Sequence, residues 1–372
     1  MAISTFILAF VTAFAVTYYV IPSIIRIATE KGLTDEPGER RSHTTSTPSL
    51  GGIGIFAGVL FSVIAWIPYQ LFGGLQYILC SCIVVFLIGV KDDIIPSRPL
   101  KKLLGQIFAA GILVYAADVR LTSLYGILGI GELTAVASYI LSIFTIIVII
   151  NAFNLIDGVN GLTGVISIVA ASGFGFWFFF ADHPEYTILS SALIGSTVAF
   201  LKYNWTPAKI FMGDTGSLLL GLLMSVLTIK FIEFHLEVPV GEMHYMPAGP
   251  AAAIGALIVP LFDTLRVFIT RLARGRSPLQ PDRNHIHHLL IDLGLNHVQT
   301  TLVLGSVAIL FIGLAVALQS FGNLISVAMM IGLALIGSIA LSIQVKRRQD
   351  ALARKAASSE QQPFDKKEPL TA

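Results

Sequence analysis

The chain has 372 residues, of which 55% are hydrophobic and only 12% are charged, with a formal net charge of +2. Soluble domains carry about 25% charged residues, so this composition excludes an ordinary soluble protein and indicates that lipid is the solvent for much of the chain. Cys80 and Cys82 lie close together in one apolar run and imply no disulfide framework. No nucleic acid partner is expected.

Apolar stretches of spanning length recur from one end of the chain to the other, each near the ~20 residues that a bilayer requires. The sequence therefore predicts an all-α, polytopic membrane protein. The first stretch has no basic segment before it and no small-residue cleavage site after it, so we expect a retained helix and not a cleaved signal. We predict eleven transmembrane helices, at residues 3–26, 50–68, 73–90, 103–119, 134–153, 159–181, 186–203, 215–232, 248–270, 299–319 and 322–344.

Lysine and arginine are distributed unequally among the loops between these predicted helices. The loops after the first, third, seventh and ninth helices and the C-terminal tail are basic, whereas those after the second, sixth and tenth contain no Lys or Arg. Basic loops remain in the cytoplasm, so we expect a periplasmic N-terminus and a cytoplasmic C-terminus in a bacterial inner membrane. Residues 1–345 are predicted to form one transmembrane domain, and the charged tail at 346–372 is predicted to be disordered.

Asp92 and Asp93 follow the third predicted helix on its cytoplasmic side. Adjacent carboxylates repel each other and are costly to desolvate unless a cation neutralises them. A solvated helix end is the simpler explanation of this pair, and Mg²⁺ or proton handling is the functional one. Lys101 and Lys102 follow closely in the sequence and could hold an anion nearby.

Three polar residues recur at helical spacing at the cytoplasmic end of the fifth predicted helix. Asn151, Asn154 and Asp157 lie at positions i, i+3 and i+6, so they share one helix face. Hydrogen bonding between helices would explain one Asn. It does not explain three polar groups that lead into the turn Asp157-Gly158-Val-Asn160-Gly161, so we interpret this segment as part of a site.

A third polar motif, Phe211-Met-Gly-Asp214-Thr-Gly-Ser217, opens the eighth predicted helix. Small residues around one Asp at a helix N-terminus suit a site where a phosphate meets exposed N–H groups and a metal ion. An Asp that caps the helix explains the same residues equally well. A P-loop is excluded, because the Gly-Lys-Ser/Thr ending is absent.

The longest predicted cytoplasmic loop follows Arg271 and contains His285, His287 and His288 after Asp282. Three histidines and an aspartate could bind zinc. No Cys or Glu lies close by in the sequence to complete a tetrahedral set, so contact with a phosphate or a nucleotide is the favoured interpretation. A solvated polar loop is the alternative.

With Pro48–Gly52 and Pro260–Thr264, these motifs resemble those of the bacterial polyprenyl-phosphate N-acetylhexosamine-1-phosphate transferases over roughly residues 3–345. The resemblance implies transfer of an N-acetylhexosamine 1-phosphate from a UDP-sugar to undecaprenyl phosphate, a membrane lipid, with release of UMP. It implies Mg²⁺ as the cofactor, with Mn²⁺ as an alternative. A homodimer is one oligomeric state that it allows.

The resemblance also implies roles for the residues that match the motifs of the family. The implied catalytic residues are Asp92, Asp93, Asp157 and His285. The implied substrate-binding residues are Asn151, Asn154, Lys102, Arg271, His287 and His288, and the implied metal ligand is Asp214. Many members of the family have Asp at the position of Asn160, so no metal or base role is expected for Asn160.

The segment from Arg276 through Arg283 to the His-Ile-His-His run at 285–288 resembles the enzymes that start O-antigen, enterobacterial common antigen or teichoic-acid linkage units, which use UDP-GlcNAc. UDP-GlcNAc is therefore the favoured donor, with UDP-MurNAc-pentapeptide or another UDP-N-acetylhexosamine as the alternative. An ion-coupled transporter is the alternative from another class. Transporters usually bind their ions near the middle of the bilayer and often contain inverted repeats, whereas these charges gather at one face and no repeat is evident.

Overall fold

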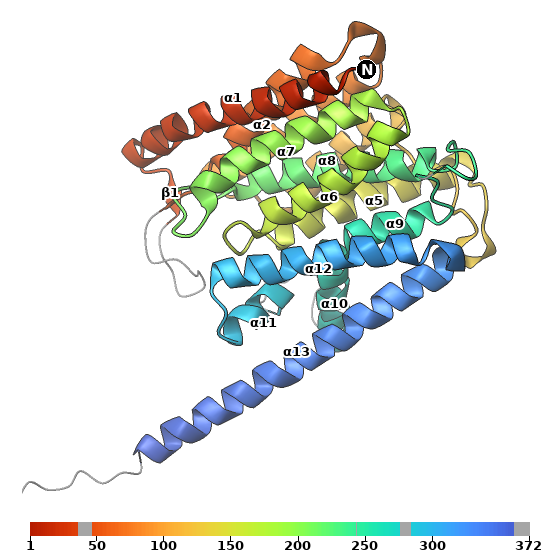
Figure 1. The fold of residues 1–372 in the computed structure, drawn as a ribbon. Helices are drawn as coiled ribbons and strands as arrows, with labels where there is room; N and C mark the ends of the chain where they lie inside the picture. Colours follow the sequence, from red (N-terminus) through yellow and green to blue (C-terminus); the bar gives the residue numbers. More distant parts are fainter. Residues whose placement is uncertain (36–46, 243, 276–283, 361–372) are drawn as a thin grey trace, which may run out of the picture.

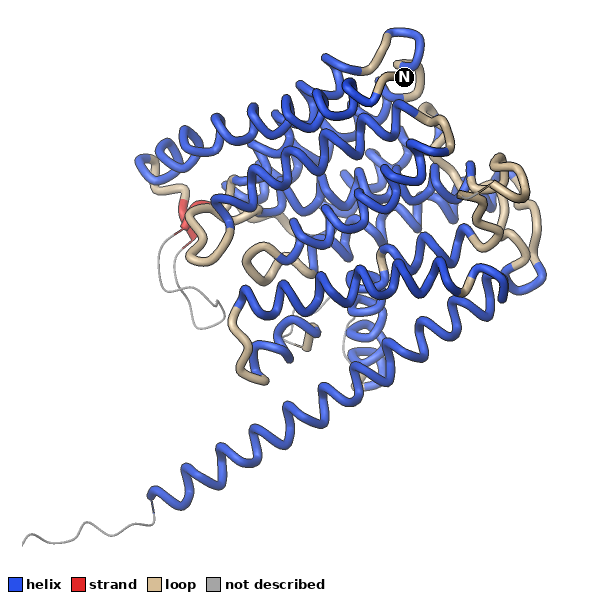
Figure 2. The backbone as a smooth tube through the Cα atoms, in the orientation of Figure 1, coloured by secondary structure: helices blue, strands red, loops and turns tan. Residues whose placement is uncertain are grey.

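The structure is a computed structural model, and it describes residues 1–35, 47–242, 244–275 and 284–360. These residues form thirteen α-helices and one short antiparallel pair of strands, β1 (Thr34–Asp35) and β2 (Thr47–Pro48), beside the end of the first helix (Figures 1 and 2). The predicted all-α fold class is confirmed.

The helices follow the predicted apolar stretches closely. Ten of the eleven predicted ranges coincide with one helix each, and the range 248–270 coincides with two. In chain order the helices are α1 (Ile3–Glu30), α2 (Gly51–Trp66), α3 (Leu75–Ile94), α4 (Pro99–Tyr115), α5 (Ala135–Leu155), α6 (Leu162–Phe180), α7 (Pro184–Asn204), α8 (Gly213–Phe234), α9 (Gly249–Ala256), α10 (Ile258–Ala273), α11 (Ile286–Asp292), α12 (His297–Ala317) and α13 (Gly322–Glu360).

Within the described part of the chain, six helices are long and apolar enough to cross a membrane, namely α1, α5, α6, α8, α12 and α13. The pair α9 and α10 makes a seventh span if it is counted as one. These helices agree with a polytopic membrane protein. The total of eleven spans and the sides on which the termini lie remain predictions.

The predicted continuous helix at 248–270 is wrong, because α9 and α10 are bent by 80° relative to each other (Figure 1). The break lies at Leu257, whose φ of −108° and ψ of 16° are not helical. Pro260 has no N–H to donate to the carbonyl of Ala256, so a straight helix would lose a hydrogen bond at this point. A search for apolar stretches does not detect such a break.

The boundary predicted at residue 345 also differs from the structure, because α13 continues as one helix to Glu360 (Figure 1). The first part of the tail that we predicted to be disordered is therefore helical. Residues 349–360 contain four Ala together with Leu, Arg and Lys and no Gly or Pro, a composition that favours a helix despite its charge. Residues 361–372 lie outside the described residues.

Helix α8 lies at the centre of the bundle and is almost completely buried, whereas α1 and α13 are largely exposed. It packs against α2, α3, α5 and α6. Glycines let two of these helices approach its first turn backbone to backbone. A Cβ atom on Gly52 would lie 2.1 Å from the nitrogen of Gly216, and one on Gly89 would lie 2.4 Å from the Cα atom of Thr215. The position of Asp214, in the same turn, is therefore fixed by α2 and α3.

Candidate active site

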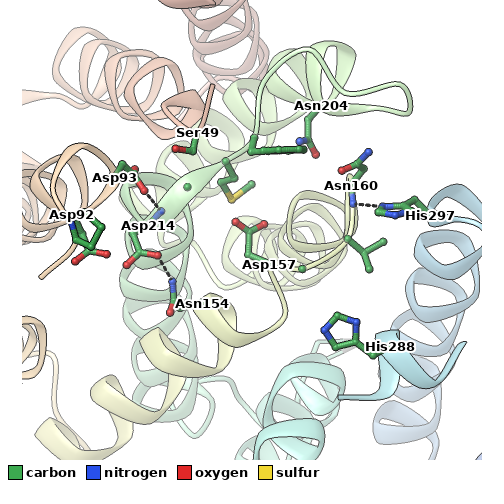
Figure 3. Close-up of a pocket in the computed structure, with 16 residues that line it drawn as sticks. Ser49, Asp92, Asp93, Asn154, Asp157, Asn160, Asn204, Asp214, His288 and His297 are labelled. Carbon is green, nitrogen blue, oxygen red and sulfur yellow. Dashed lines mark hydrogen bonds between the residues drawn. The ribbon is translucent and has the colours of Figure 1, made fainter. Parts of the chain in front are cut away.

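A cavity of about 510 Å³ opens where several helices end or begin (Figure 3). It is lined by residues from the ends of α3, α5 and α7, from the starts of α8 and α12, and from α11. The structure thus brings together six of the residues that the sequence singled out. The polar residues of the lining are Ser49, Asp92, Asp93, Asn154, Asp157, Asn160, Asn204, Asp214, His288 and His297.

Asp93 connects the end of α3 to the start of α8. Its Oδ1 accepts a hydrogen bond from the backbone N–H of Asp214 at 2.7 Å, and its Oδ2 accepts from the N–H of Thr215 at 3.0 Å and from the Thr215 hydroxyl. Gly213, just before these donors, has a φ of +70°, a conformation that favours glycine. Asp93 therefore caps α8 from a neighbouring helix, a structural task that the sequence did not predict for it.

Lys102, in the first turn of α4, lies between two of the carboxylates. Its Nζ is 3.1 Å from Oδ2 of Asp92 and also contacts Oδ2 of Asp214. The other oxygen of Asp214 accepts a hydrogen bond from Nδ2 of Asn154 at 3.0 Å, and Asn154 also donates to the hydroxyl of Ser217 at 2.9 Å. These contacts join α3, α4, α5 and α8 into one network of charged and polar groups.

The side chains around Asp214 can be compared with the needs of a divalent cation. Within the described ranges, no group of three or more His, Cys, Asp or Glu side chains is arranged to hold a metal ion. Mg²⁺ usually takes only one or two carboxylates from a protein and completes its shell with water and substrate phosphates. Asp92 and Asp214 already share one cation, the ammonium group of Lys102. This donor set fits a Mg²⁺ ion that a phosphate substrate helps to bind.

Asp157 lies in the turn between α5 and α6 and lines the same cavity (Figure 3). Burial, together with the nearby negative charges of Asp214 and Asp93, raises the pKa of this carboxyl to about 7. A group that titrates near neutral pH can accept or give a proton under working conditions. Asp157 therefore has the properties of a general base.

Residues 285–288, called the histidine segment below, contact a buried carboxylate on α10 at their first two residues. Oδ2 of Asp263 is 2.8 Å from Nδ1 of His285, and Oδ1 of Asp263 accepts a hydrogen bond from the backbone N–H of Ile286 at 2.9 Å. The sequence placed Asp263 in a motif but predicted no role for it. His285, which we expected to be catalytic, is buried behind the cavity and is not among the residues that line it.

The other two histidines of this segment lie closer to the cavity, and His288 is part of its lining (Figure 3). His287 packs against Gly158, where an added Cβ atom would come within 2.7 Å of its Nε2. Burial and the neighbouring His288 lower the pKa of His287 to about 3, so its ring is neutral at physiological pH. Gly158 therefore leaves room for a buried imidazole and does not only make the turn that the sequence predicted.

Two of the expected substrate-binding residues lie elsewhere. Nδ2 of Asn151 donates to Oε1 of Gln106 and to the carbonyl of Ile147, both at 2.8 Å, so Asn151 joins α5 to α4 inside the bundle. Arg271 is buried in the last turn of α10 and does not line the cavity. Of the stretch on which the choice of donor rests, residues 276–283 lie outside the described residues.

Sequence reasoning missed His297 and Asn204. Nδ1 of His297 accepts the backbone N–H of Asn160 at 3.2 Å, and Oδ1 of Asn204 accepts the N–H of Gly161 at 2.7 Å. Both residues therefore hold the turn that presents Asp157. The available sign was their position, because each is a polar residue beside the end of a predicted apolar stretch.

The comparisons with known proteins bear on this site. The family described as glycosyl transferase family 4 matches residues 75–232. A Bacillus subtilis (strain 168) protein with the name "Probable undecaprenyl-phosphate N-acetylglucosaminyl 1-phosphate transferase" is 30% identical over 84% of this chain and 85% of its own length. The chain belongs to glycosyl transferase family 4. The resemblance that we inferred from the motifs is therefore confirmed.

Two further relatives have similar names and cover most of the chain. The undecaprenyl-phosphate alpha-N-acetylglucosaminyl 1-phosphate transferase of Escherichia coli O157:H7 is 28% identical over 87% of this chain and 86% of that protein. The decaprenyl-phosphate N-acetylglucosaminephosphotransferase of Mycobacterium tuberculosis (strain ATCC 25618 / H37Rv) is 29% identical over 91% and 89%. The segment of this glycosyl transferase that matches the family contains Asp92, Asp93, Asp157 and Asp214.

Proposed function

We propose that the protein transfers N-acetylglucosamine 1-phosphate from UDP-GlcNAc to undecaprenyl phosphate at the cytoplasmic face of the bacterial inner membrane. The products are undecaprenyl-diphospho-GlcNAc and UMP, and the lipid product starts a cell-envelope polysaccharide. One observation carries the proposal. Asp92, Asp93, Asp157 and Asp214 line one cavity at the ends of apolar helices, in a chain whose relatives are named for this transfer.

The reaction needs an attacking phosphate, charge stabilisation and a proton acceptor. An oxygen of the lipid phosphate attacks the phosphorus that carries the sugar, and UMP leaves. A phosphate monoester has a second pKa near ~6, so a carboxylate with a pKa of about 7 is basic enough to take its last proton. Burial raises the pKa of Asp93 to about 7 as well, but both of its oxygens accept hydrogen bonds from the start of α8. Asp157 is therefore our candidate base.

The cations of the site balance the charge of the phosphates. Lys102 lies within reach of Asp92 and Asp214 and can turn its ammonium group onto a phosphate that enters the cavity. Asp214 would hold Mg²⁺, and the ion would supply Lewis-acid stabilisation of the charge that develops on the leaving UMP. His288 lines the opposite side of the cavity and can donate a hydrogen bond to the diphosphate (Figure 3).

A second, apolar cavity supports a lipid acceptor. It has a volume of about 240 Å³ and lies between α5, α8, α9 and α10, with the segment 121–127 as a further wall. The bend between α9 and α10 shapes one side of it. On α5 its lining extends from Phe144 to Ile149, and Asn154 in the catalytic cavity follows about 8 Å further along the helix. We infer that part of the prenyl chain lies here.

The two alternative functions, an ion-coupled transporter and a peptidoglycan enzyme, predict different products in the same assay. An ion-coupled transporter would release no UMP, and its charged groups would be expected near the middle of the bilayer. In the described residues, the carboxylates of the cavity lie instead at helix ends. A peptidoglycan enzyme would prefer UDP-MurNAc-pentapeptide, so a comparison of donors separates this alternative from ours.

The test is a transfer assay with the purified protein in detergent, undecaprenyl phosphate and Mg²⁺. Radiolabelled UDP-GlcNAc and UDP-MurNAc-pentapeptide are supplied in parallel, and label that enters the lipid phase is counted. We expect transfer from UDP-GlcNAc. Transfer from UDP-MurNAc-pentapeptide alone would overturn the choice of donor, and no lipid product from any UDP-N-acetylhexosamine would overturn the proposed function.

A further inference from the structure

The three imidazoles of His285, His287 and His288 form a row of neighbouring rings, called the stack below, that leads from the protein interior to the catalytic cavity. The ring centroids of His285 and His287 are 5.5 Å apart with planes inclined by only 10°, whereas those of His287 and His288 are 4.3 Å apart with planes inclined by 52°. Of the three, only His288 lines the cavity in the described structure. Its position therefore depends on how the other end of the stack is held.

The inner end of the stack is held by Asp263. Both Asp263 and His285 are almost inaccessible, with exposed fractions of 2% and 4%. An ionised carboxylate can only accept hydrogen bonds, so Nδ1 of His285 must carry the proton in the 2.8 Å contact with Oδ2. Arg266 lies 3.3 Å from the other oxygen, so the buried carboxylate is also paired with a guanidinium group.

The same carboxylate also anchors the helix that carries His287 and His288. Oδ1 of Asp263 accepts the N–H of Ile286, the first residue of α11. A helix of seven residues is too short to be stable by itself, so its position depends on such contacts. In an active site, a displacement of about 1 Å can cost about 10²-fold in rate.

We propose that Asp263 is a positioning residue for the transfer reaction. Its two oxygens fix the protonated Nδ1 of His285 and the first turn of α11, and they thereby hold His288 in the cavity. Asp263 itself does not line the cavity, so it acts through the histidine segment. The inference rests on the proposed function, because the reaction that His288 serves is the transfer proposed above.

The variant Asp263→Asn tests the proposal. Its side chain has an NH2 group in place of one oxygen, so it cannot accept at both of the positions where His285 and Ile286 donate. We expect kcat for transfer to fall by about 10- to 100-fold, while KM for the UDP-sugar changes little, because the stack is misplaced but the donor still binds. The control is Asp292→Asn, the same change at an exposed position of α11, which should keep the wild-type kcat.

A double-mutant cycle shows whether Asp263 acts through His285. We expect Asp263→Asn to cause little further loss in a His285→Gln background, because both changes break the same contact. If the double variant lost kcat by the product of the two single losses, the proposal would be overturned. A wild-type kcat in Asp263→Asn would also overturn it. If the wild-type protein itself transfers no sugar phosphate, the proposed function fails instead.

A second measurement does not depend on how the Asp263 variant folds. In wild-type protein labelled with ¹⁵N-histidine, the signals of His285 are assigned by their loss in His285→Gln. We expect its Nδ1 to be protonated. A neutral ring with the proton on Nε2 would overturn the proposal, because that ring could not donate to Asp263.

Discussion

At the scale of single residues, Asp157 differs from the other carboxylates of the cavity, whose oxygens are occupied by contacts within the protein that compete with a substrate. Asp93 is occupied by the N–H groups of α8, and Asp92 and Asp214 share the ammonium group of Lys102. Burial and the charges of its neighbours raise the pKa of Asp157 to about 7. The protonation state of this group therefore changes within the physiological pH range.

We expect the rate of transfer to follow the ionisation of Asp157. A base must be deprotonated to act, so kcat/KM should rise about tenfold per pH unit below about pH 7 and level off above it. Asp157→Asn should lower kcat by about 10²- to 10⁴-fold and remove this rise. Initial rates measured across the pH range check both expectations. An Asp157→Asn variant that keeps the rise would show that another group is the base, and Asp93, whose pKa is also raised to about 7 by burial, would be the first candidate.

Much of the site could be predicted from the sequence, because a charged residue at the end of an apolar helix is conspicuous. Asp92, Asp157 and Asp214 were found in this way. The spacing of Asn151, Asn154 and Asp157 predicted one shared helix face, but α5 ends at Leu155, before Asp157. It also could not show that Asn151 bonds to Gln106 on α4 while Asn154 bonds to Asp214 on α8. The contact between Asp263 and His285 could not be predicted either, since it depends on the direction that α10 takes after the bend.

At the scale of the elements, the close approach of α3 to α8 positions the first turn of α8. A Cβ atom on Gly89 would lie 2.4 Å from the Cα atom of Thr215, next to Asp214, so the two helices would have to separate. The backbones of both helices, and not a flexible side chain, would have to move. This contact links the packing of the bundle to the geometry of the catalytic cavity.

We therefore expect Gly89→Ala to impair both stability and transfer. Overpacking typically costs about 1–3 kcal/mol, and a shift of Asp214 should lower kcat by at least about tenfold. Gly111→Ala in α4 is the matched control, because a Cβ atom there would meet nothing within 4 Å. Its activity should stay unchanged, with a small gain in stability. Thermal unfolding in detergent and the transfer assay measure both effects, and equal behaviour of the two variants would contradict the account.

The helices were predicted from the length of apolar stretches. Ten of the predicted ranges therefore match one helix each, whereas the bend between α9 and α10 and the extension of α13 were not predicted. Pro260 lies in the first turn of α10, where a missing N–H is tolerated, so composition alone could not distinguish a kinked helix from a new one. In the tail, charge suggested disorder, whereas the helix propensity of Ala, Leu, Arg and Lys extends α13. Both differences come from local backbone preferences that hydropathy does not measure.

At the scale of the whole molecule, the catalytic cavity and the basic end of α13 lie on the same side of the bundle. Arg348 contacts the carbonyl of Leu293 at the end of α11, the helix that carries His288. If the positive-inside rule places the C-terminus in the cytoplasm, the cavity must open there too. This agrees with a nucleotide donor, which is available in the cytoplasm.

We expect membrane vesicles to show this orientation. UDP-GlcNAc added outside inverted vesicles should be used, because their cytoplasmic face is outward, whereas sealed right-side-out vesicles should use little until detergent opens them. A fluorescent protein fused to the C-terminus should be degraded by external protease only in the inverted vesicles. The reverse pattern in either experiment would show that the predicted topology is inverted.

The central claim is that Asp214 and its neighbours release UMP from a UDP-sugar only when a polyprenyl phosphate accepts the sugar phosphate. The most direct test measures UMP release by the purified protein with UDP-GlcNAc and Mg²⁺, with and without undecaprenyl phosphate, for the wild type and for Asp214→Asn. We predict release that requires the lipid and Mg²⁺ and falls by at least about 10²-fold in the variant. Equal release without the lipid, or an unimpaired Asp214→Asn variant, would contradict the account.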